Sequence, residues 1–194
     1  MKESIQRLRK QTITLYHQER YKMAEKKNDK PKFEDIATSV LSGDALKNAL
    51  NFAFYLRENR MNPLWSAANA WKVSYKTFTI CFIRLHGAAE YHNLSLGDWH
   101  INPFIGAYES DALSSEDKDI AWANKKPCRT CNRCALPLEK IFGKDFVPAC
   151  EGSVLFVNPN IAAVECAKSI IKLRRNEIKE GKARKHQYVA VRNR

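Results

Sequence analysis

Four cysteines in the second half of the chain have the spacing of a metal site. Three follow one another at two-residue gaps and the fourth comes after fifteen further residues; they are Cys128, Cys131, Cys134 and Cys150. In a C-x-x-C knuckle two thiolates can reach one ion, and zinc takes four thiolates in a tetrahedron. The sequence therefore predicts a structural zinc site, in which no coordination position stays open for catalysis.

Other interpretations of these thiols stay open. The run C-x-x-C-x-x-C also begins a ferredoxin-type iron–sulfur motif, but a fourth cysteine followed by proline is missing at the usual short spacing. Free thiols or a redox C-x-x-C are further alternatives, although a redox motif normally follows a strand and none is predicted here. Cys81 and Cys166 are expected to be small buried residues, with Cys166 a substitute for Cys150 as fourth ligand.

The N-terminus is charged and lacks the apolar segment of a signal peptide, and no apolar run is long enough to cross a bilayer. We therefore expect a soluble, cytoplasmic protein. Cysteines stay reduced in that compartment, which favours a metal site over three disulfides. With 194 residues and 44% hydrophobic content, the chain can bury one substantial core.

The net charge of +12 is concentrated at the two ends of the chain. Residues 1–32 contain ten Lys or Arg against four Asp or Glu, and residues 168–194 contain ten against two. The middle, 33–167, contains thirteen against fifteen. This asymmetry indicates an anionic partner, whether nucleic acid, an acidic protein or a membrane surface. The alternative is that charged ends only keep the protein in solution.

Eight basic residues in these ends are the candidates for phosphate contacts. They are Arg7, Arg9, Lys10, Arg174, Arg175, Lys182, Arg184 and Lys185. The first hypothesis is a non-enzymatic binding or regulatory module that is stabilised by zinc and engages DNA or RNA. An inhibitor or scaffold of one acidic protein is an alternative with the same charge pattern.

A small-molecule sensor or minor enzyme is a third hypothesis. Trp71 and Tyr75 lie on a predicted strand and, together with His100, could border a ligand pocket. The stretch from His86 to His100 also contains three histidines and two carboxylates. These groups could ligate a metal or transfer protons, but they follow no known catalytic order, and a polar loop with exposed histidines explains them more simply.

Helical and extended periods alternate along the chain. Helices are predicted over residues 2–27, 35–40, 45–59 and 161–180, with a short one after Ser114 or Ser115. Strands are predicted over residues 71–75, 78–85, 98–102 and 153–157. The helix over 45–59 has Asp44 as its predicted N-cap and a broad apolar face that includes Phe54.

Strands clustered between helices predict an α+β fold, in which helices pack on a small, mainly antiparallel sheet and the zinc knuckle is an insertion. The predicted organisation is a basic N-terminal helix (1–32), an α+β domain (33–181) that contains the knuckle (127–150), and a basic C-terminal tail (182–194). Terminal segments of this composition are ordered only when something holds them.

Overall fold

The computed structural model describes residues 30–67, 69–85, 97–105, 112–125, 138–142, 144–149 and 154–183. The chain divides into two compact units, Met1–Lys32 and Phe33–Arg194, and every described helix and strand belongs to the second. The helix predicted over residues 2–27 lies outside the described residues.

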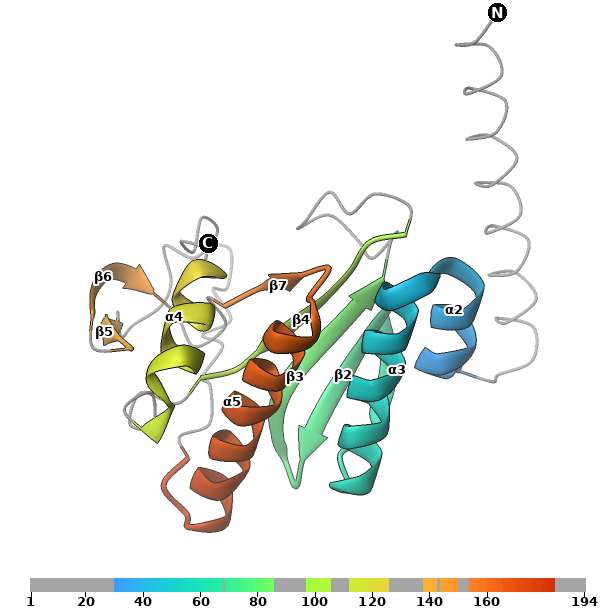
Figure 1. The fold of residues 1–194 in the computed structure, drawn as a ribbon. Coiled ribbons are helices and arrows are strands. Elements are labelled where there is room, and N and C mark those ends of the chain that lie inside the picture. Colours follow the sequence, from blue (N-terminus) through green and yellow to red (C-terminus); the bar gives the residue numbers. More distant parts are fainter. Residues whose placement is uncertain are drawn as a thin grey trace, which may run out of the picture. The chain divides into compact units, whose positions relative to one another are not determined.

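Five antiparallel strands form the central sheet (Figure 1). They are β1 (Pro63–Ala67), β2 (Ala70–Tyr75), β3 (Phe78–Leu85), β4 (Trp99–Pro103) and β7 (Phe156–Val157), and they lie side by side in that order. Aromatic and β-branched residues favour extended backbone in β2 and β3. The turn that joins these two strands places Lys76 at a φ of 53°, so a tight hairpin forms although the turn contains no glycine.

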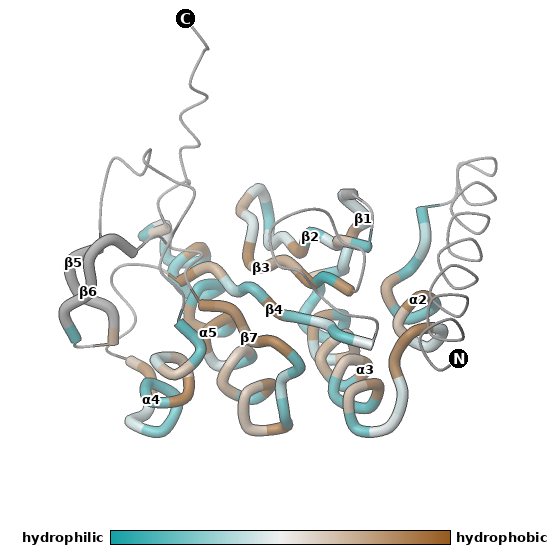
Figure 2. The backbone as a smooth tube through the Cα atoms, turned by 90° about the horizontal axis from the view of Figure 1, so that it is seen from above, coloured by the Kyte–Doolittle hydropathy of each residue, from teal (hydrophilic) through white to brown (hydrophobic). Residues whose placement is uncertain are grey.

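Four described helices accompany the sheet. They are α2 (Phe33–Val40), α3 (Gly43–Glu58), α4 (Ser115–Ala123) and α5 (Ile161–Lys179). α3 and α5 lie next to each other on one face of the sheet (Figures 1 and 2). The side chain of Asn160 caps α5 by accepting a hydrogen bond from the N–H of Ala163 at 2.9 Å, and Ser114 caps α4 from Asp117 at 3.1 Å.

The core lies between these helices and the sheet. Successive side chains of a strand point to opposite faces, and paired residues of neighbouring strands share a face. The register aligns Trp71, Ile83 and Ile101 across three strands, and all three are fully buried. Phe33 of α2 meets Trp71 edge to face, with 5.3 Å between the ring centres. The predicted α+β class with an antiparallel sheet is therefore confirmed.

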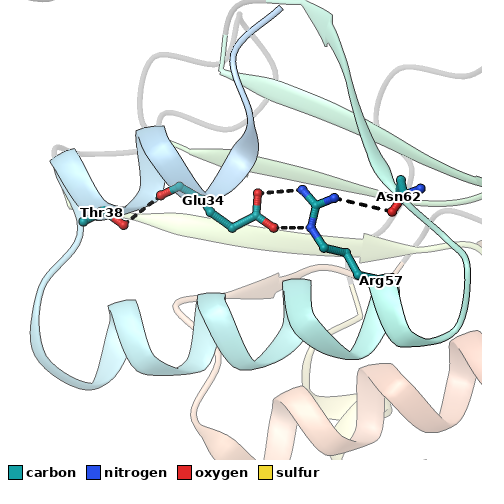
Figure 3. Close-up of polar contacts among 4 residues, drawn as sticks. All are labelled: Glu34, Thr38, Arg57 and Asn62. Carbon is teal, nitrogen blue, oxygen red and sulfur yellow. Dashed lines mark hydrogen bonds and ion pairs between the residues drawn. The ribbon is translucent and has the colours of Figure 1, made fainter.

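An ion pair joins α2 to the end of α3 (Figure 3). Arg57 donates to both carboxylate oxygens of Glu34, at 2.5 and 2.8 Å, and to the Asn62 amide oxygen at 3.4 Å. The hydrogen bond to Glu34 raises the pKa of Arg57 above its usual range. This contact fixes the short helix α2 against the longer one.

Two local predictions about α3 are wrong. Ser42, not Asp44, occupies the N-cap position, and the helix begins at Gly43. Phe54 is 63% exposed, because the buried face of the helix is set by the positions around Phe52 and Leu56. The broad apolar pattern of this helix does not distinguish its buried edge from its exposed one.

Strand β1 and a second sheet were not predicted from the sequence. β1 begins at Pro63, which suits the first position of an edge strand because no N–H is needed there. The second sheet is a hairpin of β5 (Leu138–Ile141) and β6 (Lys144–Ala149), and its strands show no apolar alternation in the sequence. Within the described residues, the strand expected over 153–157 appears as the short β7 and an isolated bridge at Val154.

Candidate functional site

The described part of the chain includes three of the eight basic candidates. Arg174 and Arg175 lie near the end of α5, and Lys182 follows this helix. The other five lie outside the described residues; they are Arg7, Arg9, Lys10, Arg184 and Lys185. The positions of the three described residues show that neighbouring basic residues have different roles.

Arg174 faces the interior of the protein. Its guanidinium donates to the Glu177 carboxylate at 2.6 Å, and the two side chains are only 4% and 2% exposed. The positions that precede and follow on the same face of α5, such as Ile170 and Ile178, belong to the hydrophobic core. Arg174 is therefore part of a buried ion pair and does not present its charge to a partner at the surface.

Arg175 points away from the core and joins three elements. Its guanidinium donates to the side-chain oxygen of Asn59 at 2.6 Å, just after α3. It also lies over the ring of Tyr75, 5.2 Å from the ring centre, at the β2–β3 turn. The side chain is half-buried, so Arg175 both stabilises this corner and leaves positive charge near the surface.

Four cations of α5 share one face of the helix. Lys168, Lys172, Arg175 and Lys179 are spaced by four, three and four residues, which keeps them on one face over about 16 Å. We call these four residues the basic stripe. Lys172 and Lys179 are exposed, whereas Lys168 and Arg175 are half-buried. The four-three-four spacing can be read from the sequence, but the basic residues predicted from the sequence to contact phosphate include only Arg175 and none of the three lysines.

The first cation of the basic stripe is held by α3. The Lys168 ammonium donates to the Asn51 amide oxygen at 2.5 Å and to the Glu165 carboxylate at 2.7 Å, and it lies 5.4 Å from the centre of the Tyr55 ring. Burial raises the pKa of Tyr55, so its hydroxyl stays protonated and donates to the backbone oxygen of Lys168 at 3.2 Å. Neutral amide and phenol groups thus line the stripe on the α3 side.

Lys182 lies beyond the end of α5 and is exposed. Its ammonium pairs with Glu180 at 2.7 Å, and both side chains remain more than half exposed. An ion pair of this kind is weak in water, so it leaves the lysine accessible to a stronger anionic partner. Gly181, with a φ of 73°, forms the turn that separates Lys182 from the helix.

The three residues proposed for a ligand pocket do not converge. Trp71 is fully buried against Phe33 on the helix-covered face of the sheet. His100 is also buried, but it is in register with Arg84 and points to the opposite face. Tyr75 lies under the guanidinium of Arg175. The sheet itself separates Trp71 from His100, so these side chains cannot border one cavity.

The histidine-rich stretch is described only from residue 97 onward. There Asp98 accepts a hydrogen bond from the Asn158 amide at 2.6 Å, next to β7. Within the described ranges, no three His, Cys, Asp or Glu side chains come together as a metal site would require. His86 and the other residues up to 96 lie outside these ranges.

The four cysteines of the predicted zinc site also lie outside the described residues. Two backbone pairings, however, bracket the segments that carry them. Lys125 is bridged to Val154, and Leu138 is paired with Ala149 in the second hairpin. The segment that carries Cys128, Cys131 and Cys134 runs from Lys125 to Leu138, and the segment that carries Cys150 runs from Ala149 back to Val154. Each end of the first segment is therefore paired with one end of the second, Lys125 with Val154 and Leu138 with Ala149.

The two described cysteines are buried thiols. Burial raises the pKa of the Cys81 thiol and raises that of Cys166 to about 12, with the Asp117 carboxylate adding to the effect at Cys166. The Cys166 thiol donates to the backbone oxygen of Asp117 at 3.3 Å. The prediction that Cys81 and Cys166 are small buried residues is therefore confirmed.

An aromatic–cation cluster lies beside the start of the cysteine segment. The Lys125 and Lys144 ammonium groups are 3.8 and 5.0 Å from the centre of the Trp122 ring. Lys144 also pairs with Asp119 of α4 at 3.6 Å, which ties the second hairpin to this helix. Burial lowers the pKa of Lys125 to about 8.

No helix within the described ranges is long and apolar enough to cross a membrane. Comparison of the chain with protein-family models, with curated proteins and with solved structures finds no match. Inferences about function therefore depend on the residues and their arrangement alone.

Proposed function

We propose that this chain is a non-enzymatic, zinc-stabilised module that binds nucleic acid through its basic ends. The observation that carries the proposal is the basic stripe, four cations on one face of α5 in a segment with ten Lys or Arg and two Asp or Glu. Arg174 and Glu177 neutralise each other in the interior, so nine Lys or Arg stand against one Asp or Glu in the rest of this segment.

The chemistry of the stripe suits a phosphate backbone. Lys172 and Lys179 are exposed ammonium groups two turns apart, and such groups bind phosphates by releasing condensed counterions. Arg175 is held in place by Asn59, so it adds positive potential without a large loss of side-chain freedom on binding. Lys168 is already paired with Glu165 and adds less. Binding of this kind depends strongly on salt and weakly on base sequence.

The test compares two pairs of lysines in the full chain. Lys172→Gln/Lys179→Gln removes two charges from the stripe, and Lys47→Gln/Lys118→Gln removes two from α3 and α4. We expect the stripe variant to reduce the slope of log affinity against log salt for duplex DNA by about 1.8, at about 0.9 per lost phosphate contact. The control pair leaves that slope unchanged.

Two outcomes would overturn the nucleic-acid proposal. One is the absence of measurable affinity for DNA or RNA at low salt; the other is an equal change of slope in both lysine pairs. Recovery of one acidic protein, without nucleic acid, by the immobilised full chain would instead favour an inhibitor or scaffold.

The proposed zinc site is supported by the backbone pairings at the ends of the two cysteine-containing segments. Four cysteines supply the thiolate set that zinc prefers, and the pairings Lys125–Val154 and Leu138–Ala149 return both segments to common points. Cys128, Cys131, Cys134 and Cys150 would hold the ion. A zinc ion bound by four thiolates stabilises the fold and leaves no position for substrate.

Elemental analysis of the purified chain tests the metal site. We expect about one zinc per chain, lost in Cys131→Ser together with part of the circular-dichroism signal, and retained in Cys166→Ser. If the purified chain instead shows an iron chromophore, the cysteines hold an iron–sulfur cluster and the zinc assignment is wrong. Unchanged zinc content in Cys131→Ser would show that these cysteines are not the ligands.

A further inference from the structure

The face of the sheet opposite α3 and α5 has its own chemical character. Along one register row lie Leu64, Lys72, Phe82 and Asn102, contributed by β1, β2, β3 and β4. Leu64 and Lys72 are exposed, and Phe82 and Asn102 are half-buried. None of the described helices lies on this face (Figure 2). Four adjacent strands therefore contribute a row of exposed or half-buried side chains to this face, and the row includes one aromatic ring.

The charged side chains that the described strands contribute to this face are positive. The five strands of the central sheet contain no Asp or Glu, and their charged residues are Lys72 and Arg84. Both point to the helix-free face, because Trp71 and Ile83, their neighbours in sequence, are buried on the other one. An anionic partner is electrostatically favoured here over a neutral or cationic one.

Arg84 is oriented by the residues around it. Its guanidinium lies over the Phe82 ring, 4.7 Å from the ring centre, and its terminal nitrogen is 3.3 Å from the His100 ring nitrogen. The Phe104 ring is tilted against Phe82 by 51°, with 6.0 Å between the ring centres. Phe82 and Arg84 together thus form an aromatic platform with a cation at its edge.

We infer that this helix-free face binds a single strand of nucleic acid. An unpaired base stacks on Phe82 and Arg84, while Lys72 contacts the adjoining phosphate. Base stacking on aromatic rings is available only to unpaired bases, since those of a duplex are already stacked on each other. The inference rests on the proposed function and deepens it. The sheet binds single strands, whereas the basic stripe contacts the phosphate backbone of both single strands and duplexes.

The experiment measures fluorescence anisotropy of the full chain with a 12-nucleotide single strand and with a duplex of the same sequence. Phe82→Leu keeps an apolar side chain but removes the ring, and we expect about tenfold weaker binding of the single strand with duplex binding unchanged. Phe54→Leu is the matched control, because Phe54 is an exposed phenylalanine on the helix side. This control leaves both affinities unchanged.

Lys72→Gln provides a second variant in case Phe82→Leu does not fold. Lys72 is exposed, and its loss is expected to reduce the salt slope for the single strand by about 0.7. Equal weakening of single-strand and duplex binding in both variants would overturn the inference, as would no effect in either. Single-strand binding that depends on Lys172 and Lys179 but not on Phe82 or Lys72 would leave the proposed function standing and remove the role of the sheet.

Discussion

Arg174 and Arg175 are adjacent in the sequence but belong to two different regions of the protein. Arg174 lies in the interior, paired with Glu177 and 4% exposed. Arg175 is half-buried in the basic stripe, in contact with Asn59 and Tyr75. One residue of an α-helix turns the side chain by about 100°, which is enough to move a charge from the surface to the core.

The difference shows that a count of basic residues overstates the charge available to a partner. In the interior, a charge requires an opposite charge and hydrogen bonds, because desolvation is costly. At the half-buried position of Arg175, neutral partners such as Asn59 and Tyr75 suffice, because part of the side chain stays in contact with water. The inner face of α5 is therefore expected to govern stability, and the basic stripe is expected to govern binding.

The largest expected effect is on the inner face. Glu177→Gln removes the negative partner of a buried guanidinium, so we expect the free energy of unfolding to fall by about 3–5 kcal/mol. Urea denaturation followed by circular dichroism measures the change. Glu180→Gln, in the exposed pair with Lys182, is the control and changes stability by less than about 0.5 kcal/mol.

Replacement of both buried charges sharpens this test. In Arg174→Met/Glu177→Met neither charge is left without its partner, so most of the stability lost in Glu177→Gln is expected to return. Salt dependence of DNA binding is expected to match that of the unmodified chain. If the double variant binds DNA with a smaller salt slope, Arg174 contributes charge at the surface and the comparison fails.

A smaller effect is expected at Arg175. Arg175→Lys keeps the charge but loses the planar contact with Tyr75 and the geometry of the bond to Asn59, so stability is expected to fall by about 1 kcal/mol. Thermal denaturation measures this, and the DNA salt slope stays the same. Lys172→Arg, at an exposed position of the stripe, is the matched control and leaves stability unchanged. A large loss of affinity in Arg175→Lys would show that this guanidinium contacts the ligand directly.

The smallest effect is expected for the ion pair between α2 and α3. Arg57 and Glu34 make two hydrogen bonds, but their side chains are 40% and 27% exposed, so Arg57→Gln is expected to cost about 0.5–1 kcal/mol. Urea denaturation at low and high salt measures the contribution and its screening. If Arg57→Gln lowers the free energy of unfolding as much as Glu177→Gln does, the burial of an ion pair does not determine how much it contributes to stability.

Much of the α+β body is predictable from local patterns. The alternation in β2 and the apolar run of β3 indicate strands, and the helical period over 161–180 indicates α5, because each signal depends on a few neighbouring residues. Strand β1 has no such signal, since its five residues become a strand only by pairing with β2. The hairpin of β5 and β6 likewise depends on pairing between Leu138 and Ala149, eleven positions apart.

The candidate site is predictable only in part. The sequence locates an excess of positive charge in residues 168–194, and the metal-ligand spacing of its cysteines is a local property. It does not separate Arg174 from Arg175, and it groups Trp71 with His100 although the sheet lies between them. The sequence does not predict which side chains share a pocket, because the face on which each lies is set by strand register. Register depends on pairing partners that are distant in the chain.

By itself the sequence determined the four described helices, the strands β2, β3 and β4, their antiparallel arrangement and the regions where basic charge collects. Periodicity and composition are enough for these, since they express short-range preferences and burial. Only the tertiary structure decided which α5 cations face outward, which strand residues lie on the helix-free face and where the cysteine segments begin and end. Those choices follow from packing and pairing between residues far apart in the chain, which no local pattern encodes.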